Sequence, residues 1–261
     1  MYRYLQAILC LSLVIFLVSG LPLTNDHAEE LSGNFEGDMV LSNEQRSSLN
    51  INRNGLLDEK YRWPNNTVQY KIIPENLTSE QIDYIHKALN TIANVSCLTF
   101  VEAAPDATSY VRVVGDTTGC FSKVGFTGSI QDLNLAPNVL EQGCFRLGTI
   151  INEFLHALGF YHMQSASDRD DYVTIVWENI QPGREHNFEK YASTEISSFD
   201  TGYDYGSVLH YPATAFSVNE ERTIIPKDPN ATIGQRKGMS EKDIAKLNHM
   251  YKCDGSINKN H

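Results

Sequence analysis

The spacing of apolar and polar residues predicts a helix early in the globular part of the chain, which begins near Tyr61. Thr78 and Gln81 have the spacing of a capping box, in which two side chains satisfy backbone N–H groups at the start of a helix. Apolar residues then recur every three or four positions, so they share one helical face. These residues are Ile82, Ile85, Leu89 and Ile92.

Shorter apolar runs without this helical period are typical of strands. A second helix begins near Leu147 and must end at Gly159, because glycine permits the backbone conformation that terminates a helix. A last helix begins at Ser240 and extends through Tyr251. Since strands dominate before the central helix and loops after it, we expect an α+β protein with two lobes and a cleft between them. The strands are predicted at 68–73, 98–101, 110–114, 123–126 and 130–135.

The first twenty residues have the pattern of a secretory signal peptide. Arg3 lies in a short polar head before an unbroken apolar run from Ala7 to Val18, and small or compact residues follow up to Gly20. A membrane-spanning helix needs about 20 apolar residues, more than this run contains, so we expect a secreted, extracellular protein with a signal peptide at 1–20. Four glycosylation sequons fit that compartment, at Asn65, Asn76, Asn94 and Asn230.

Composition narrows the class of protein further. Hydrophobic residues make up 41% of the 261 residues and charged residues 20%, as in ordinary soluble globular proteins. The net charge of -11 argues against a nucleic-acid partner. Residues 21–53 are polar, acidic and short of large apolar side chains, so this segment on its own cannot bury enough surface to fold.

The cysteines indicate disulfides. Cys10 leaves with the signal peptide, and an even number of cysteines remains in an oxidising compartment. Their spacing includes no CxxC pair, which argues against a structural zinc site. Three pairings are open to the four that remain, which are Cys97, Cys120, Cys144 and Cys253.

Residues 152–162 contain the residues most informative about chemistry. On a helix, Asn152 and His156 lie one turn apart, so both side chains can reach the same metal ion. Glu153 projects beside them as a candidate general base, and a turn at Gly159 can bring in His162 as a further ligand. This is the spacing of the HExxHxxGxxH motif of zinc proteases, with asparagine at the first histidine position.

The chain resembles the astacin family of zinc endopeptidases over nearly its whole length. The resemblance implies a two-lobed metzincin catalytic domain with a central zinc helix, a deep cleft for extended peptide or protein substrates, and one zinc ion per subunit. It further implies zinc ligands at His156 and His162, an additional ligand at Tyr211 and a general base at Glu153. The segments that match the family pattern include 168–170, 172–173, 177–180, 203–211, 234–236 and 243–248.

The same resemblance explains the polar leader as the pro-segment of a zymogen. Residues 35–39 match the family motif whose aspartate, Asp38 here, occupies the metal site and keeps the precursor inactive. The family pattern places the mature N-terminus near Asn54, after Arg53, where an activating trypsin-like protease can cut. We therefore expect a propeptide at 21–53 and a protease domain at 54–261. The family pairing of cysteines implies Cys97–Cys253 and Cys120–Cys144 bridges.

The chain departs from the family at four positions near the expected site. Asn152 replaces a zinc-binding histidine, Met163 a glutamate, Ala166 an arginine and Leu209 the methionine of the Met-turn. The first departure matters most, because a neutral amide oxygen is a much poorer zinc ligand than imidazole. We expect zinc to bind weakly or not at all, and peptide hydrolysis to be weak or lost.

Two functions stay open at this stage: a zinc metalloendopeptidase of low activity, and an inactive secreted pseudoprotease that binds peptides or acts as a decoy. If the protein is active, Arg236 is expected near the pocket beyond the cleaved bond, where it would favour acidic residues. The sequence predicts no oligomer.

Overall fold

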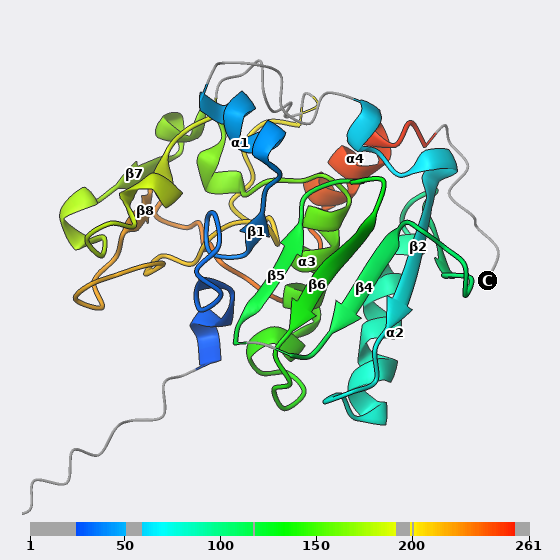
Figure 1. Cartoon of the computed structure of the whole chain (residues 1–261). Coiled ribbons are helices and arrows are strands. Elements are labelled where there is room, and N and C mark those ends of the chain that lie inside the picture. The colour runs from blue at the N-terminus through cyan, green and yellow to red at the C-terminus, as the bar shows by residue number, and fades with distance from the viewer. Residues whose placement is uncertain (1–24, 51–58, 117, 192–198, 200, 254–261) are drawn as a thin grey trace, which may run out of the picture.

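Two regions of different construction make up the described chain. The computed structural model describes residues 25–50, 59–116, 118–191, 199 and 201–253 (Figure 1). The predicted signal peptide and the predicted cleavage point after Arg53 lie outside these residues. One region is a sheet backed by two helices, and the other consists mostly of loops and 3-10 helices. The α+β prediction is therefore confirmed.

The first region is a six-stranded sheet in the order β1-β5-β6-β4-β2-β3. Neighbouring strands are parallel except for β5 and β6, which are antiparallel. The strands are β1 (Met39–Val40), β2 (Thr67–Ile72), β3 (Thr99–Glu102), β4 (Tyr110–Val114), β5 (Cys120–Lys123) and β6 (Ile130–Leu135).

Two helices, α2 (Ser79–Ala93) and α3 (Leu147–Ala157), pack on one face of this sheet (Figure 1). Helix α2 begins with the predicted capping box, in which the Thr78 and Gln81 side chains both bond to backbone N–H groups. Its Ile85, Leu89 and Ile92 are buried in the same core as α3, because the apolar period places them on one face.

The second region holds little regular structure. It contains the short antiparallel pair β7 (Val173–Ile175) and β8 (Ile224–Pro226) around a separate apolar cluster, and the chain returns to the first region through α4 (Glu241–Met250). Helix α1 (Asn43–Asn50) follows β1 and precedes the other strands of the sheet. The 3-10 helices are Asn25–Glu30, Glu59–Tyr61, Pro64–Asn66, Gly143–Phe145, Met163–Ser165, Arg169–Asp171, Trp177–Asn179 and Glu185–Phe188.

One predicted strand was placed wrongly. The structure has β5 at Cys120–Lys123 in place of 123–126. Gly125 has a positive φ of 71°, which ends the extended conformation, and its N–H donates to the carbonyl oxygen of His156. The end of the strand is thus determined by a contact with the central helix, which the apolar pattern does not record.

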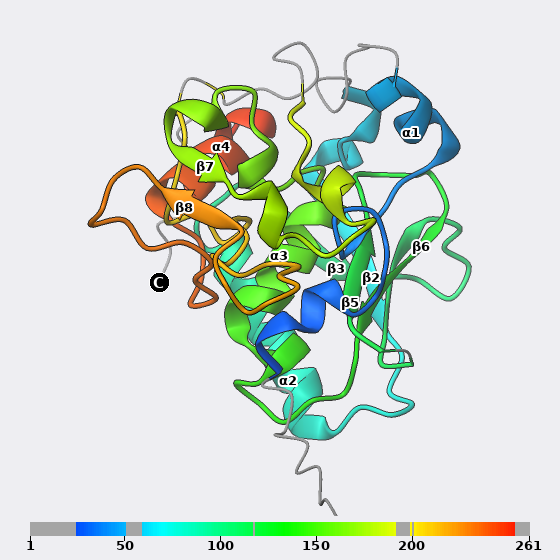
Figure 2. The same ribbon diagram turned by 90° about the vertical axis from the view of Figure 1, so that its left-hand side faces the viewer.

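Residues 25–50, which we call the N-terminal segment, lie between the two regions and pass across helix α3 (Figures 1 and 2). Met39 extends the sheet through β1, and the backbone N–H of Phe216 in the second region donates to Glu30. The segment is too polar to fold alone, but here the rest of the chain supplies the surface against which Met39 is fully buried.

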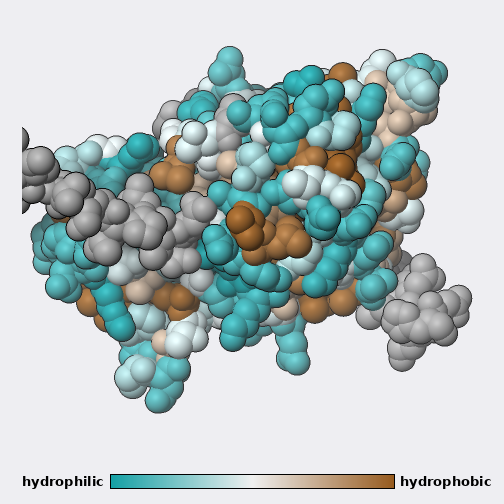
Figure 3. All heavy atoms as spheres, turned by 90° about the horizontal axis from the view of Figure 1, so that it is seen from below, coloured by the Kyte–Doolittle hydropathy of each residue, from teal (hydrophilic) through white to brown (hydrophobic). Residues whose placement is uncertain are grey.

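Among the described residues, no helix has both the length and the apolar content needed to cross a membrane. Seen from below, the surface is mostly polar, with apolar side chains in small separate groups (Figure 3).

Helix α3 lies so close to the Arg236 backbone that Gly148 is needed at the contact. The Gly148 N–H donates to the Arg236 carbonyl oxygen at 2.9 Å, and an added Cβ would lie 2.2 Å from the Arg236 carbonyl carbon. We predict that Gly148→Ala lowers the free energy of unfolding by about 1–3 kcal/mol, although alanine favours helices. Thermal unfolding measures this, with Gly206→Ala as control, since its added Cβ meets nothing closer than 3.5 Å. Equal melting temperatures for the two variants would contradict the prediction.

Candidate active site

Helix α3 positions the first half of the site, and its residues from Gly148 to Ala157 are all buried. His156 points its Nδ1 at the Phe160 carbonyl oxygen, 2.7 Å away. A carbonyl can only accept, so Nδ1 donates and Nε2 is left to face the site. Gly159 then turns the chain with a φ of 106° and brings in His162, whose ring centroid lies 4.7 Å from that of His156.

Asp38 of the N-terminal segment meets both imidazoles. Its Oδ1 lies 3.3 Å from His162 Nε2 and 3.6 Å from His156 Nε2, and the ligand atoms of the three residues lie within 4.8 Å of one another. Tetrahedral zinc bonds of about 2.0–2.2 Å place ligand atoms roughly 3.4 Å apart, which is close to the two distances from Asp38.

These atoms also lack other partners. Both Asp38 carboxylate oxygens and the Nε2 atoms of His156 and His162 are buried without a hydrogen bond. Buried polar groups are normally satisfied, so their convergence fits a metal ion. Burial alone would raise the pKa of Asp38, but the neighbouring His162 and His156 lower it well below its usual range.

Glu36 holds the second imidazole in place, a role the sequence did not reveal. Its Oε2 accepts from His162 Nδ1 at 2.9 Å, so that ring too directs Nε2 at Asp38. Glu36 itself is 1% exposed and accepts from Ser165 at 2.8 Å and from Tyr191. Carboxylates that orient metal-binding histidines act in this way. Glu36 lies in the 35–39 motif, but no local pattern there indicates a contact with His162, 126 residues further along the chain.

Tyr211 lies beside the site with its hydroxyl turned elsewhere. Its ring is buried 4.8 Å from that of His162, but its hydroxyl donates to the Glu36 backbone oxygen at 2.6 Å. Burial, together with Glu36 and Asp38, raises the pKa of Tyr211 well above its ordinary value. While the N-terminal segment is bound, the hydroxyl is therefore a neutral hydrogen-bond donor to that segment.

Asn152 and Glu153 occupy the expected positions on α3. The Asn152 amide nitrogen donates to the Val208 carbonyl oxygen at 3.3 Å, and its Oδ1 has no hydrogen-bond partner. Neither Glu153 carboxyl oxygen has one either. Burial raises the pKa of Glu153 well above its ordinary value, and the negative charges of Asp38 and Glu29 raise it further. The N-terminal segment thus favours a neutral Glu153.

The other residues that depart from the family pattern pack against apolar side chains, and one of them also contacts a lysine. Met163 is 7% exposed, and its sulfur accepts from the Lys246 ammonium group at 3.1 Å. Leu209 is buried in the core beneath the site, where leucine and methionine fill similar volumes. Ala166 packs at the edge of the second apolar cluster.

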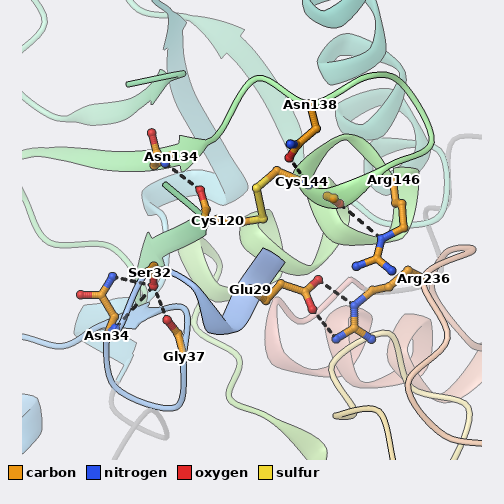
Figure 4. Close-up of a disulfide and its surroundings, with 12 residues drawn as sticks. Glu29, Ser32, Asn34, Gly37, Cys120, Asn134, Asn138, Cys144, Arg146 and Arg236 are labelled. Carbon is orange, nitrogen blue, oxygen red and sulfur yellow. Dashed lines mark hydrogen bonds and ion pairs between the residues drawn. A yellow bond between two sulfur atoms is a disulfide. The ribbon is translucent and has the colours of Figure 1, made fainter. Parts of the chain in front are cut away.

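A second anchor joins the N-terminal segment to the second region. Arg236 forms a bidentate pair with Glu29 at 2.7 and 2.8 Å, beside the Cys120–Cys144 bridge (Figure 4). The side chains are only 5% and 10% exposed. Burial alone would raise the pKa of Glu29, but Arg236 lowers it below its ordinary value. The guanidinium group therefore holds an ionised carboxylate inside the protein.

The disulfides and sequons complete the set of predicted residues. Cys97 bonds to Cys253, and Cys120 to Cys144, the pairing that the family resemblance implied. The four sequon asparagines are exposed at Asn65, Asn76, Asn94 and Asn230.

Comparison with known proteins gives the same class. A sequence model of the peptidase family described as Astacin matches residues 56–252. Zinc metalloproteinase nas-15 of Caenorhabditis elegans is 38% identical over 232 residues, covering 84% of this chain and 39% of that relative, so the chain spans about two fifths of it. Seminal metalloprotease 1 of Drosophila melanogaster is 40% identical over 233 residues, covering 88% of this chain and 90% of the relative.

Solved structures agree. High choriolytic enzyme 1, a hatching enzyme zinc-protease from Oryzias latipes, superposes with a TM-score of 0.68 at 36% identity, over 75% of this chain and 96% of that one. Myroilysin shares the fold alone, with a TM-score of 0.51 at 18% identity, over 72% of this chain and 96% of that one. Fold and site are those of a class whose known members include zinc proteases. The chain belongs to the astacin family.

The buried Glu29–Arg236 pair should stabilise the docked N-terminal segment. We predict that Glu29→Gln lowers the free energy of unfolding of the whole chain by about 3–5 kcal/mol, because it leaves the Arg236 charge buried without its counterion. Thermal unfolding measures the loss. Glu44→Gln is the matched control, since Glu44 pairs with Lys60 at the surface, where solvent screens the charges.

The pH dependence follows from the same pair. The pKa of Glu29 in the folded chain lies below its ordinary value of 4.5, so its stabilisation is present above that value and lost as the pH falls through the folded pKa. Arg236 stays charged, and the other charges acting on Glu29 are those of Asp38 and Arg146. The difference between wild type and Glu29→Gln should be constant between about pH 5 and 7 and shrink below it. A constant difference at acid pH would contradict this account.

Proposed function

We propose that this chain is a secreted zinc metalloendopeptidase precursor whose mature domain hydrolyses peptide bonds weakly or not at all. The observation that supports this most is the pair of His156 and His162 Nε2 atoms converging on one buried point, with Asn152 in place of a third imidazole. In this proposal residues 1–20 are a signal peptide, 21–53 a propeptide and 54–261 the protease domain. The four exposed sequons carry glycans, and the protein acts extracellularly as a monomer.

The chemistry rests on groups already in place. Zinc bound by the two histidines would polarise the peptide carbonyl and stabilise negative charge on its oxygen. Glu153 lies on α3 next to Asn152, and leaving of the N-terminal segment removes the charges of Asp38 and Glu29 that favour its neutral form. It can then take a proton from the attacking water. The Tyr211 hydroxyl, released from Glu36, becomes free to bind metal or substrate oxygen.

Activation requires removal of the N-terminal segment, because Asp38 and Glu36 occupy the site. We assign the cut to a trypsin-like protease acting after Arg53. The mature domain would then bind protein or peptide substrates in extended form.

A second function, a secreted pseudoprotease that binds peptides without cleaving them, is favoured by one contact. Asn152 donates its amide to Val208, so this side chain is built into the scaffold as a structural residue. Such a protein would retain the substrate-binding surface and act as a binder or decoy.

Restoring the lost ligand tests the assignment of function. We predict that Asn152→His raises the zinc affinity and the chelator-sensitive peptide cleavage of the mature form at least about 10–100-fold. Loss of a residue that only orients a metal ligand already has an effect of this size, and a ligand itself should matter at least as much. Zinc content and hydrolysis of a fluorogenic peptide library measure both. Asn152→His with Glu153→Gln is the control, which should bind zinc but not cleave. Equal cleavage by wild type and Asn152→His would show that Asn152 is not what limits activity.

Arg236 is expected to set a preference for acidic residues just beyond the cleaved bond. The Glu29 carboxylate on its guanidinium group shows the contact that an acidic substrate side chain would make. We predict that the Asn152→His mature form cleaves before Asp or Glu, and that Arg236→Gln reduces this preference at least about 10-fold, since the lost bidentate charged pair is worth roughly 1.5–3 kcal/mol. Cleavage-site profiling of a peptide library measures it, and a profile without acidic preference would sink the assignment.

A further inference from the structure

We propose that the N-terminal segment is part of the zinc site of this chain, so that the uncut chain binds zinc more tightly than the mature domain and releases the metal on activation. This inference rests on the proposed zinc-dependent function. It follows from three contributions of the segment to the site: a ligand, a negative charge and a residue that orients a ligand. It also follows from the few ligands that remain in the mature domain when the segment leaves.

The first contact supplies a ligand. With Asp38 in place, two imidazoles and one carboxylate converge at separations of 3.3 and 3.6 Å. Two histidines and a carboxylate are a complete three-ligand set for zinc in known peptidases. Asn152 offers only a neutral amide oxygen, so in this chain Asp38 is the third strong ligand and not simply a plug in a site that is complete without it.

The second contribution is charge. Asp38 is 1% exposed, and neither carboxylate oxygen has a hydrogen-bond partner. A buried carboxylate without donors is costly unless a cation lies beside it, so the aspartate and a divalent ion stabilise each other. Tyr211 cannot replace it equally, because a phenol is a neutral oxygen ligand until it loses its proton.

The third contact orients a ligand. Glu36 accepts from His162 Nδ1 at 2.9 Å and is itself held by Ser165 and Tyr191. Loss of such an orienting carboxylate typically costs 10–100-fold in metal affinity. Gly37 lets the segment present both carboxylates, since its φ of 86° turns the backbone between them and an added Cβ would lie 3.0 Å from the Glu29 carbonyl oxygen.

All three contributions leave together when the segment is cut and dissociates. What remains is two imidazoles, one without its orienting carboxylate, and the Tyr211 hydroxyl. Removing the segment from a three-histidine site would uncover a complete ligand set. Here the same cleavage removes the third ligand, so zinc affinity should fall at least about 100-fold.

A zinc-transfer measurement tests this directly. The uncut chain, loaded with one equivalent of zinc, is cut after Arg53 by a trypsin-like protease and freed of the segment by gel filtration in the presence of a chromophoric zinc chelator. We expect zinc to pass to the chelator in step with cleavage. In Asn152→His, whose third imidazole stays in the mature domain, most of the zinc should remain bound.

Variants of the uncut chain identify the residues responsible. Asp38→Asn and Glu36→Gln should each weaken zinc binding at least about 10-fold in competition with the same chelator, whereas Glu44→Gln, on the exposed part of the segment, should not. Melting curves recorded without zinc show whether each variant is folded. Unchanged zinc affinity in a folded Asp38→Asn chain overturns the inference, as does retention of zinc by the cut wild type.

The outcomes also separate this inference from the proposed function. If the cut wild type retains zinc and cleaves peptides, only the inference fails. If neither the uncut chain nor the Asn152→His mature form binds zinc, the proposed zinc-dependent function fails with it. If zinc passes to the chelator and the mature wild type cleaves no peptide, the inference is supported. The mature form then has lost activity, as the proposed function allows.

Discussion

Two carboxylates of one short turn, Glu36 and Asp38, hold the two imidazoles of the site. Asp38 faces the Nε2 atoms of both histidines, and Glu36 accepts from His162 Nδ1. This turn is buried, and it contacts both the end of α3 and Tyr211 of the second region. The N-terminal segment therefore makes specific polar contacts at the site in addition to covering it.

A second contact, the Glu29–Arg236 ion pair, also holds the N-terminal segment against the rest of the protein. Arg236 binds Glu29 with its side chain and Gly148 of α3 with its backbone, so one residue links the segment to the helix that carries His156. An ion pair with this little solvent access contributes only when both partners are present. The segment thus occupies the Arg236 guanidinium group with a carboxylate of its own.

Asn152 departs from the family motif, and the fold of the family is nevertheless present in this chain. The disulfides, the sheet and the turn at Gly159 are all retained, since each depends on residues remote from Asn152. Asn152 stands at the first ligand position of the family motif, and helix α3 forms around it without interruption. Met163 is a second departure that the fold accommodates. It stands where the family has a glutamate, and its thioether sulfur accepts from Lys246.

Much of the fold and the site residues could be predicted from the sequence, because both depend on local spacing. The capping box at Thr78 and the i, i+4 relation of Asn152 and His156 follow from helix geometry. The end of β5, the place of Glu36 on His162 and the Glu29–Arg236 pair could not be predicted, since they join residues far apart in the chain. Sequence thus determined which ligands the helix offers. Only tertiary structure decided that the distant carboxylate of Asp38 lies beside both imidazoles, because that depends on how two separate segments pack.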